Sequence, residues 1–91
     1  MKGKSFIVRI DGTIEHVEPE NGTNFTLDEL KKAIGGGYIE VVPLTFDKVM
    51  VVDEDGKRKQ LALNVAATRI YNGPNDFIVG DALVCHRKQI R

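Results

Sequence analysis

Alternating apolar and polar residues near the start of the chain predict a β-hairpin. Residues 4–10 follow the two-residue period of a strand with one buried face. Asp11-Gly12 comes next, and this pair favours the positive φ angles of a two-residue type I′ turn. Residues 13–18 then return as a more polar edge strand, which ends at Pro19 because proline has no N–H to donate to a sheet.

Two further β-rich runs lie in the middle of the chain. Residues 38–44 form the first, which is interrupted by Pro43, and residues 49–52 form the second. The second run is continuously apolar, which is typical of a central strand buried on both faces. An acidic, glycine-containing loop follows it, so we expect residues 57–63 to return as a strand paired with residues 49–52.

The clearest local signal is a helix that begins after Thr26. Thr26 and Glu29 have the spacing of a capping box, in which each side chain accepts a hydrogen bond from the other residue's backbone N–H. Phe25 and Leu30 have the spacing of a hydrophobic staple across this helix start. Leu27, Leu30 and Ile34 form one apolar face. The glycines at 35–37 end the helix, because glycine readily takes the left-handed conformation of a C-terminal cap.

A second short helix is predicted over residues 65–71, with Asn64 as its N-cap. Residues 77–79 and 82–85 are β-rich. Gly80-Asp81 joins them either as a bulge within one strand or as a tight corner between two strands. Together these elements predict an α+β fold, in which a small mixed, mostly antiparallel sheet carries two short helices.

Length and charge indicate one globular domain. The chain has 91 residues, with 13 Lys and Arg against 13 Asp and Glu. We expect a single domain over residues 1–91, with an ordered core at about 4–85 and a polar, basic tail at 86–91 that frays. Because the net charge is zero and the basic residues 57–59 are not interleaved with aromatic residues, nucleic acid is an unexpected partner.

Several other classes of protein are disfavoured. No apolar run reaches the roughly 18 residues of a membrane-spanning helix, and no secretory signal precedes the first strand. We therefore expect no membrane interaction and a cytoplasmic location. Cys85 is the only cysteine, which excludes an internal disulfide and a zinc ribbon. No ligand spacing indicates a metal site, and no cofactor is expected.

Few residues suggest catalysis. A Cys–His pair would require Cys85 to meet His16 or His86, and His86 points to the opposite face as its neighbour on a strand. Cys85 follows apolar residues, which favours a buried core thiol. The glycines at 35–37 follow a helix instead of preceding one, which favours a helix end over a phosphate-binding loop. We expect no enzymatic activity and no catalytic residues.

One polar set is the candidate ligand site. Asn64 and Thr68 lie four residues apart, so a helix presents them on one face. Arg69 adds a planar guanidinium that suits a carboxylate or a phosphate. Tyr38 adds a flat surface for a base if its segment converges on this helix. The predicted ligand-binding residues are therefore Tyr38, Asn64, Thr68 and Arg69. The alternative is that Asn64, Thr68 and Arg69 serve only in helix capping and surface ion pairs.

The order of short motifs resembles a family of small domains. The motifs are Ile10-Asp11-Gly12, Val17-Glu18-Pro19, Phe25-Thr26-Leu27-Asp28-Glu29-Leu30, Gly37-Tyr38-Ile39-Glu40-Val41-Val42, residues 50–57, Leu63-Asn64 with Ala67-Thr68, and Ile78-Val79-Gly80-Asp81. From about Phe6 to Cys85 the chain resembles domain of unknown function 3846, found in bacteriophages and in bacteria that carry mobile elements. The resemblance implies a phage or mobile-element origin and a bacterial cytoplasm, but no activity and no site residues. The chain departs from the family pattern at Val65-Ala66, where proline is common, and in its three consecutive glycines.

Two functions from different classes follow. The first is a non-catalytic accessory protein that forms a homo-oligomer and sequesters a small anionic, nucleotide-derived ligand in a counter-defence role. A domain of this size has little interior for a pocket, so protomers would share the site, with edge strand 13–18 and the glycine turn as contact surfaces. The alternative is a protein–protein interaction module that docks on a host protein by strand addition or through an apolar patch and inhibits it. Both rest partly on the family's phage setting, which is an analogy.

Overall fold

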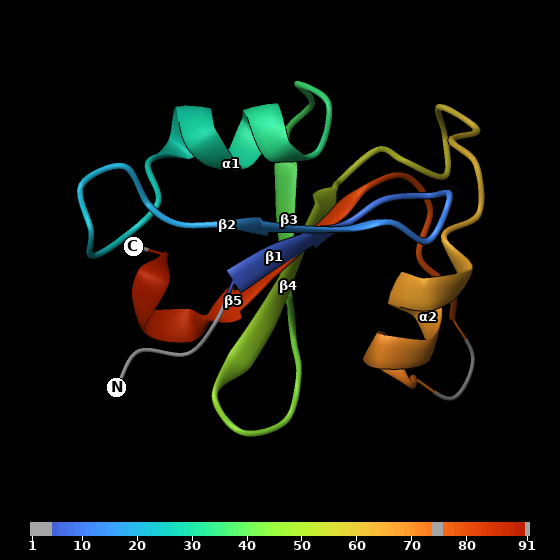
Figure 1. Cartoon of the computed structure of the whole chain (residues 1–91). Helices are drawn as coiled ribbons and strands as arrows, with labels where there is room; N and C mark the ends of the chain where they lie inside the picture. The colour runs from blue at the N-terminus through green and yellow to red at the C-terminus, as the bar shows by residue number, and fades with distance from the viewer. Residues whose placement is uncertain (1–4, 74–75, 91) are drawn as a thin grey trace.

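The computed structural model describes residues 5–73 and 76–90, in which five strands form one sheet of order β2-β1-β5-β4-β3 (Figure 1). The elements are β1 (Ser5–Val8), β2 (Ile14–Val17), α1 (Leu27–Ala33), β3 (Ile39–Pro43), β4 (Lys48–Asp53), α2 (Val65–Tyr71), β5 (Ala82–His86) and the short 3-10 helix η1 (Arg87–Gln89). Every neighbouring strand pair is antiparallel. The predicted α+β class is confirmed, while the sheet is purely antiparallel instead of mixed.

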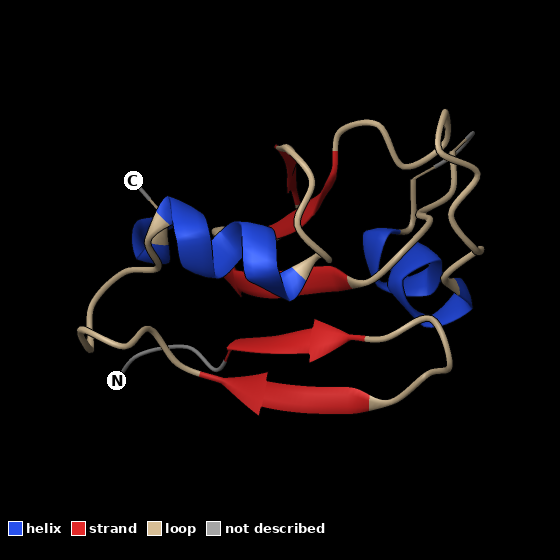
Figure 2. Ribbon diagram, turned by 90° about the horizontal axis from the view of Figure 1, so that it is seen from above, coloured by secondary structure: helices blue, strands red, loops and turns tan. Residues whose placement is uncertain are grey.

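The two helices pack against opposite faces of the sheet (Figures 1 and 2). Leu30 and Ile34 of α1 belong to a buried cluster that contains Val51, whereas Ala67 of α2 belongs to a second cluster that contains Met50. Met50 and Val51 are consecutive residues of β4, so their side chains point to opposite faces. The small domain therefore divides its apolar residues between two thin cores, one under each helix.

β4 is the buried central strand that its continuous apolar run predicts, with every residue from Val49 to Asp53 buried. The partner predicted for it is wrong. β4 pairs with β3 and β5, and residues 57–63 form no strand. The backbone after β4 bonds to itself: the N–H of Gly56 donates to the carbonyl oxygen of Asp53 at 3.1 Å, and that of Lys59 donates to Asp55 at 2.9 Å. Because residues 57–63 do not pair with β4, its second hydrogen-bonding edge is free for β5, which is more apolar than residues 57–63.

The first hairpin is confirmed, with β2 at the edge of the sheet, but its turn differs from the prediction. Arg9 and Thr13 close the loop, since the N–H of Arg9 donates to Thr13 and the N–H of Gly12 donates to Arg9, both at 2.9 Å. Of the loop residues only Gly12 has a positive φ, at 91°. This is the three-residue loop in which a left-handed glycine follows a type I turn, not a two-residue type I′ turn.

The first helix begins as predicted. Thr26 is its N-cap, and both hydrogen bonds of the capping box to Glu29 are present. Leu30 and Ile34 are buried, but Leu27 is 56% exposed and does not join the apolar face. A helix this short contacts the sheet over little more than one turn. Leu30 and Ile34, four residues apart, already occupy that contact.

The predicted fraying of the C-terminal tail is wrong for the part of it that is described. Residues 87–89 form η1, and the carbonyl oxygen of Gln89 accepts the N–H of Phe25 at 2.6 Å. The side chain of Gln89 is buried and accepts the N–H of His86 at 2.9 Å. The bond to His86 is local to η1, whereas the bond from Phe25 ties the tail to the start of α1, a long-range contact that tail composition does not reveal.

Of the two alternatives for Gly80-Asp81, the structure agrees with a corner. Val79 makes a single antiparallel bridge to Leu63, Gly80 takes a φ of +76°, and β5 begins at Ala82. Residues 77–78 are not in a strand. The corner brings the segment from Asp76 to Val79 beside α2, where it forms one wall of the groove described below.

Candidate functional site

Asn64 is a structural residue and not a ligand-binding one. It is completely buried, and its side-chain oxygen accepts the N–H of Ala67 at 2.9 Å, as an N-cap does. Its side-chain nitrogen donates to the carbonyl oxygens of Val8 and Gly80, at 2.9 and 2.8 Å. Both amide donors are therefore used, and none is left for a ligand. The N-cap prediction is confirmed, whereas the predicted role of Asn64 in ligand binding is wrong.

The other predicted site residues do not converge. The hydroxyl of Thr68 donates to the carbonyl oxygen of Asn64 and accepts the N–H of Ile78, both at 2.8 Å, so it fastens α2 to the 76–79 segment. Arg69 is exposed beside an apolar groove on α2. Tyr38 is 68% exposed, lies under the ammonium group of Lys31 at 5.0 Å from the ring centre, and does not line that groove.

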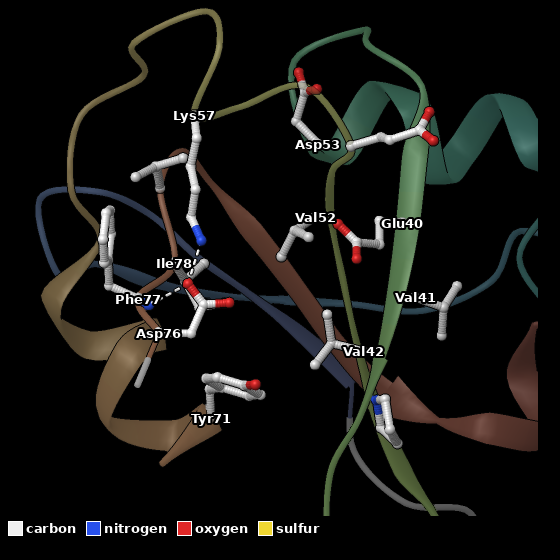
Figure 3. Close-up of a pocket in the computed structure, with 13 residues that line it drawn as sticks. Glu40, Val41, Val42, Val52, Asp53, Lys57, Tyr71, Asp76, Phe77 and Ile78 are labelled. Carbon is white, nitrogen blue, oxygen red and sulfur yellow. Dashed lines mark hydrogen bonds and ion pairs between the residues drawn. The ribbon is translucent and has the colours of Figure 1, made fainter. Parts of the chain in front are cut away.

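A groove of about 230 Å³ lies between β3 and the segment that follows α2 (Figure 3). Its apolar residues come from three parts of the chain. Val42 belongs to β3, Val52 to β4, and Ile78 to the segment before β5, and Figure 3 shows these side chains lying between the two walls. Tyr71 closes one end. We call this space the β3 groove.

The rim of the β3 groove is acidic. Four carboxylates line it, against a single lysine: they belong to Glu40, Asp53, Glu54 and Asp76, and the lysine is Lys57. Asp53 is neutralised by Lys59 at 2.9 Å, and Asp76 pairs with Lys57, which lowers the pKa of Asp76. Glu40 and Glu54 are exposed, and within residues 5–73 and 76–90 neither has an ion-pair partner. The groove therefore keeps two uncompensated negative charges, which disfavour an anionic ligand there.

The groove adjoins a free edge of the sheet. β3 pairs only with β4, and the N–H of Leu44 donates to Lys48 at 2.8 Å. The hydrogen-bonding direction of the backbone alternates along an antiparallel strand. The backbone N–H and C=O groups of Val42 and Glu40 therefore also point to β4, while the backbone groups of Ile39, Val41 and Pro43 point away from the sheet. Pro43 thus occupies an outward position, where its missing N–H costs no ladder bond.

Cys85 is confirmed as a core residue. It is fully buried, and burial raises the pKa of its thiol to about 11. A thiol of this kind remains protonated at neutral pH and is a poor nucleophile. Among the described residues, no three or more His, Cys, Asp and Glu side chains group closely enough to hold a metal ion.

The basic run at residues 57–59 is engaged with acidic side chains. Lys57 pairs with Asp76, Arg58 with Asp55 at 3.0 Å, and Lys59 with Asp53. The run is therefore not a free positive patch. In the part of the chain that the structure describes, neither helix has the length and apolar character needed to cross a lipid bilayer.

Fold and site together define a small antiparallel α+β domain whose groove opens beside an unpaired sheet edge. The family model of the domain of unknown function DUF3846 matches residues 2–90. The chain belongs to this family, as the order of its motifs indicates. No curated protein and no solved structure matches it.

Sequence reasoning missed the β3 groove as a site. The residues that line it come from segments far apart in the sequence, from Glu40 to Val79. The one usable signal was local: Pro43 marks residues 38–44 as an edge strand, and Glu40 alternates with apolar residues on it.

Proposed function

We propose that this protein is a protein–protein interaction module that binds an extended segment of its partner along β3. The partner segment adds a strand to the sheet and places basic side chains beside Glu40 and Glu54. The observation that carries the proposal is the position of the β3 groove, acidic at its rim and apolar at its floor, directly beside the free edge. Strand addition of this kind takes affinity from the backbone and specificity from the pocket.

The backbone geometry supports strand addition at β3. Ile39 and Val41 each present an N–H and a carbonyl oxygen outwards, and Pro43 presents a carbonyl oxygen. An antiparallel partner strand can therefore bond across the whole of β3. Such an edge is normally protected, and here Pro43 and the charge of Glu40 limit unspecific pairing.

The charges support a basic partner. On a partner strand, the side chains opposite Glu40 lie on the same face of the sheet as the groove, within reach of a cross-strand ion pair. The uncompensated Glu54 lies on the same rim. The partner that fits is a protein segment that alternates apolar and basic residues. In the phage setting of the family, that partner is a host protein in the bacterial cytoplasm.

Isothermal titration calorimetry with two short synthetic peptides tests this function. One peptide alternates valine and lysine, and its matched control alternates valine and glutamate. We expect only the lysine peptide to bind, and Glu40→Lys to weaken it by roughly tenfold, which corresponds to about 1.4 kcal/mol. Val41→Pro removes an outward N–H and blocks close approach, so it is expected to abolish binding without breaking the β3–β4 ladder.

Equal binding of the two peptides would contradict the role of the carboxylates. Unchanged binding by the Val41→Pro variant would contradict strand addition. The far-ultraviolet circular dichroism of each variant confirms that the sheet is intact.

A second candidate function is the sequestration of a small anionic ligand by the non-catalytic protein. What favours it is Arg69, which is exposed, unpaired among the described residues, and lines an apolar groove on α2 together with Phe77. Calorimetry with a panel of cyclic and linear nucleotides tests it. Binding at tens of micromolar that Arg69→Ala removes supports sequestration, and no binding by the wild-type protein rejects it.

A further inference from the structure

The tip of the β3–β4 hairpin carries an aromatic residue in a strained backbone conformation. The N–H of Lys48 donates to Thr45 at 3.2 Å, and the two residues between them, Phe46 and Asp47, have φ angles of 58° and 62°. This left-handed region favours glycine and asparagine, and it is an outlier for a bulky residue such as phenylalanine. Phe46 is 90% exposed, so no burial within the chain compensates for the strain.

The tip lies at the end of the sheet away from α1, where it projects beyond the other strands (Figure 1). The two-residue hairpin turn itself needs these angles, and the carbonyl oxygen of Asp47 accepts the N–H of Arg87 at 2.8 Å, but nothing in the turn needs an aromatic side chain at position 46. A fully exposed phenylalanine at a position that favours glycine or asparagine points to a use outside the chain. Asp47 adds a carboxylate beside the aromatic ring. It pairs with Arg87 at 3.4 Å, but both side chains are exposed, so this ion pair holds the carboxylate only weakly.

A matching surface lies elsewhere on the same chain. Leu63, Val65 and Phe77, each about half exposed, line a shallow groove of about 480 Å³ along α2, and we call it the α2 groove. Apolar groups line nearly all of it. Thr68 also borders it, but its hydroxyl is already engaged with backbone groups. Arg69 is the one charged residue of the lining, and its guanidinium has no ion-pair partner within the described residues.

We propose that the α2 groove binds the hairpin tip of a second copy of this chain. Phe46 enters the apolar groove, and Asp47 pairs with Arg69 of the receiving copy. The occupant follows from complementarity: the groove combines an apolar floor with a single free cation, and the tip combines an exposed aromatic ring with an adjacent carboxylate. The contact joins two different surfaces, so it is head-to-tail and generates rings or short chains.

The α2 groove shares Phe77 with the lining of the β3 groove but none of its other residues, and the inference does not rest on the proposed function. It supplies an interface for the homo-oligomer that the sequence led us to expect. The area that one hairpin tip buries is small, so the association is weak and concentration-dependent.

Sedimentation velocity of the purified chain, from about 10 μM to about 1 mM, covers the range in which such small interfaces form. We expect the weight-average sedimentation coefficient to rise with concentration for the wild-type protein. Phe46→Asn is expected to remain monomeric throughout, and to melt at the same or a higher temperature because asparagine tolerates the left-handed conformation. A wild-type protein that stays monomeric at the highest concentration overturns the proposal and assigns the groove to a different partner.

A charge exchange gives the sharper test. Asp47→Lys alone and Arg69→Glu alone each place like charges in the contact, so each is expected to be monomeric. A mixture of the two variants restores opposite charges at every contact and is expected to associate again. Recovery in the mixture also shows that both variants fold. If the mixture stays monomeric while the wild-type protein associates, the copies meet through another surface, and the proposal is wrong.

Discussion

Replacement of Asn64 by alanine is expected to remove three buried hydrogen bonds at once. The cap bond to the N–H of Ala67 is lost, at a cost of about 0.5–2 kcal/mol. The carbonyl oxygens of Val8 and Gly80 lose their partner in a site that water does not reach, at about 1–3 kcal/mol each. Because the three bonds share one side chain, the costs do not add fully, and we expect a total of about 3–5 kcal/mol.

A loss of this size is a large part of the stability of a domain this small, which is of the order of 5–14 kcal/mol. Urea unfolding followed by circular dichroism measures it, with Asn64→Ser as the matched control. Serine keeps the cap but does not reach the two carbonyl oxygens, so its loss should be intermediate. A loss below about 1 kcal/mol for Asn64→Ala would refute the structural role and return Asn64 to the list of ligand-binding candidates.

Three further predictions concern the first helix and the core. Thr26→Ala should lower the free energy of unfolding by about 0.5–2 kcal/mol and the melting temperature by several degrees, and an unchanged melting temperature would place the helix start elsewhere. The N–H groups of Thr26 and Glu20 hold the pKa of Glu29 below its usual range, so its contribution to stability is complete above about pH 4.3 and is lost as the pH falls through the lowered value. Thermal melts should therefore show a shallower acid dependence for Glu29→Gln, and identical profiles would contradict this. Because burial raises the pKa of Cys85 to about 11, a thiol reagent should label it only when the protein unfolds, and labelling at the rate of a free thiol would reveal an exposed site.

The elements predicted correctly depend on neighbours in the sequence. The capping box at Thr26, the N-cap at Asn64 and the end of α1 at the glycines each follow from residues within one or two helical turns. The apolar run of β4 was sufficient to predict a central strand. In all these cases the local backbone preference agrees with the structure that the residues adopt in the folded domain, so tertiary packing does not change the predicted element.

The errors involve contacts between distant residues. The partner of β4 depends on whether β5 or residues 57–63 compete better for the same edge, which no local pattern decides. The tail is held by a contact with the distant Phe25, whose N–H donates to the carbonyl oxygen of Gln89.

The candidate site was mispredicted for a related reason. Polar residues on a short helix were expected to face a ligand, yet the side chain of Asn64 turns back to the N–H of Ala67 and to the carbonyl oxygens of Val8 and Gly80. The β3 groove combines residues from β3, β4, α2 and the 76–79 segment, so only the folded chain assembles it.

Amide hydrogen exchange of β3, read residue by residue by NMR, tests the proposed function most directly. In the free protein the outward N–H groups of Ile39 and Val41 should exchange rapidly, whereas the N–H of Val42, which faces β4, should be protected. The peptide of alternating valine and lysine should protect Ile39 and Val41 and leave Val42 unchanged, because a new strand pairs only with the outer edge. Binding of the peptide without protection of Ile39 and Val41 would contradict strand addition at β3.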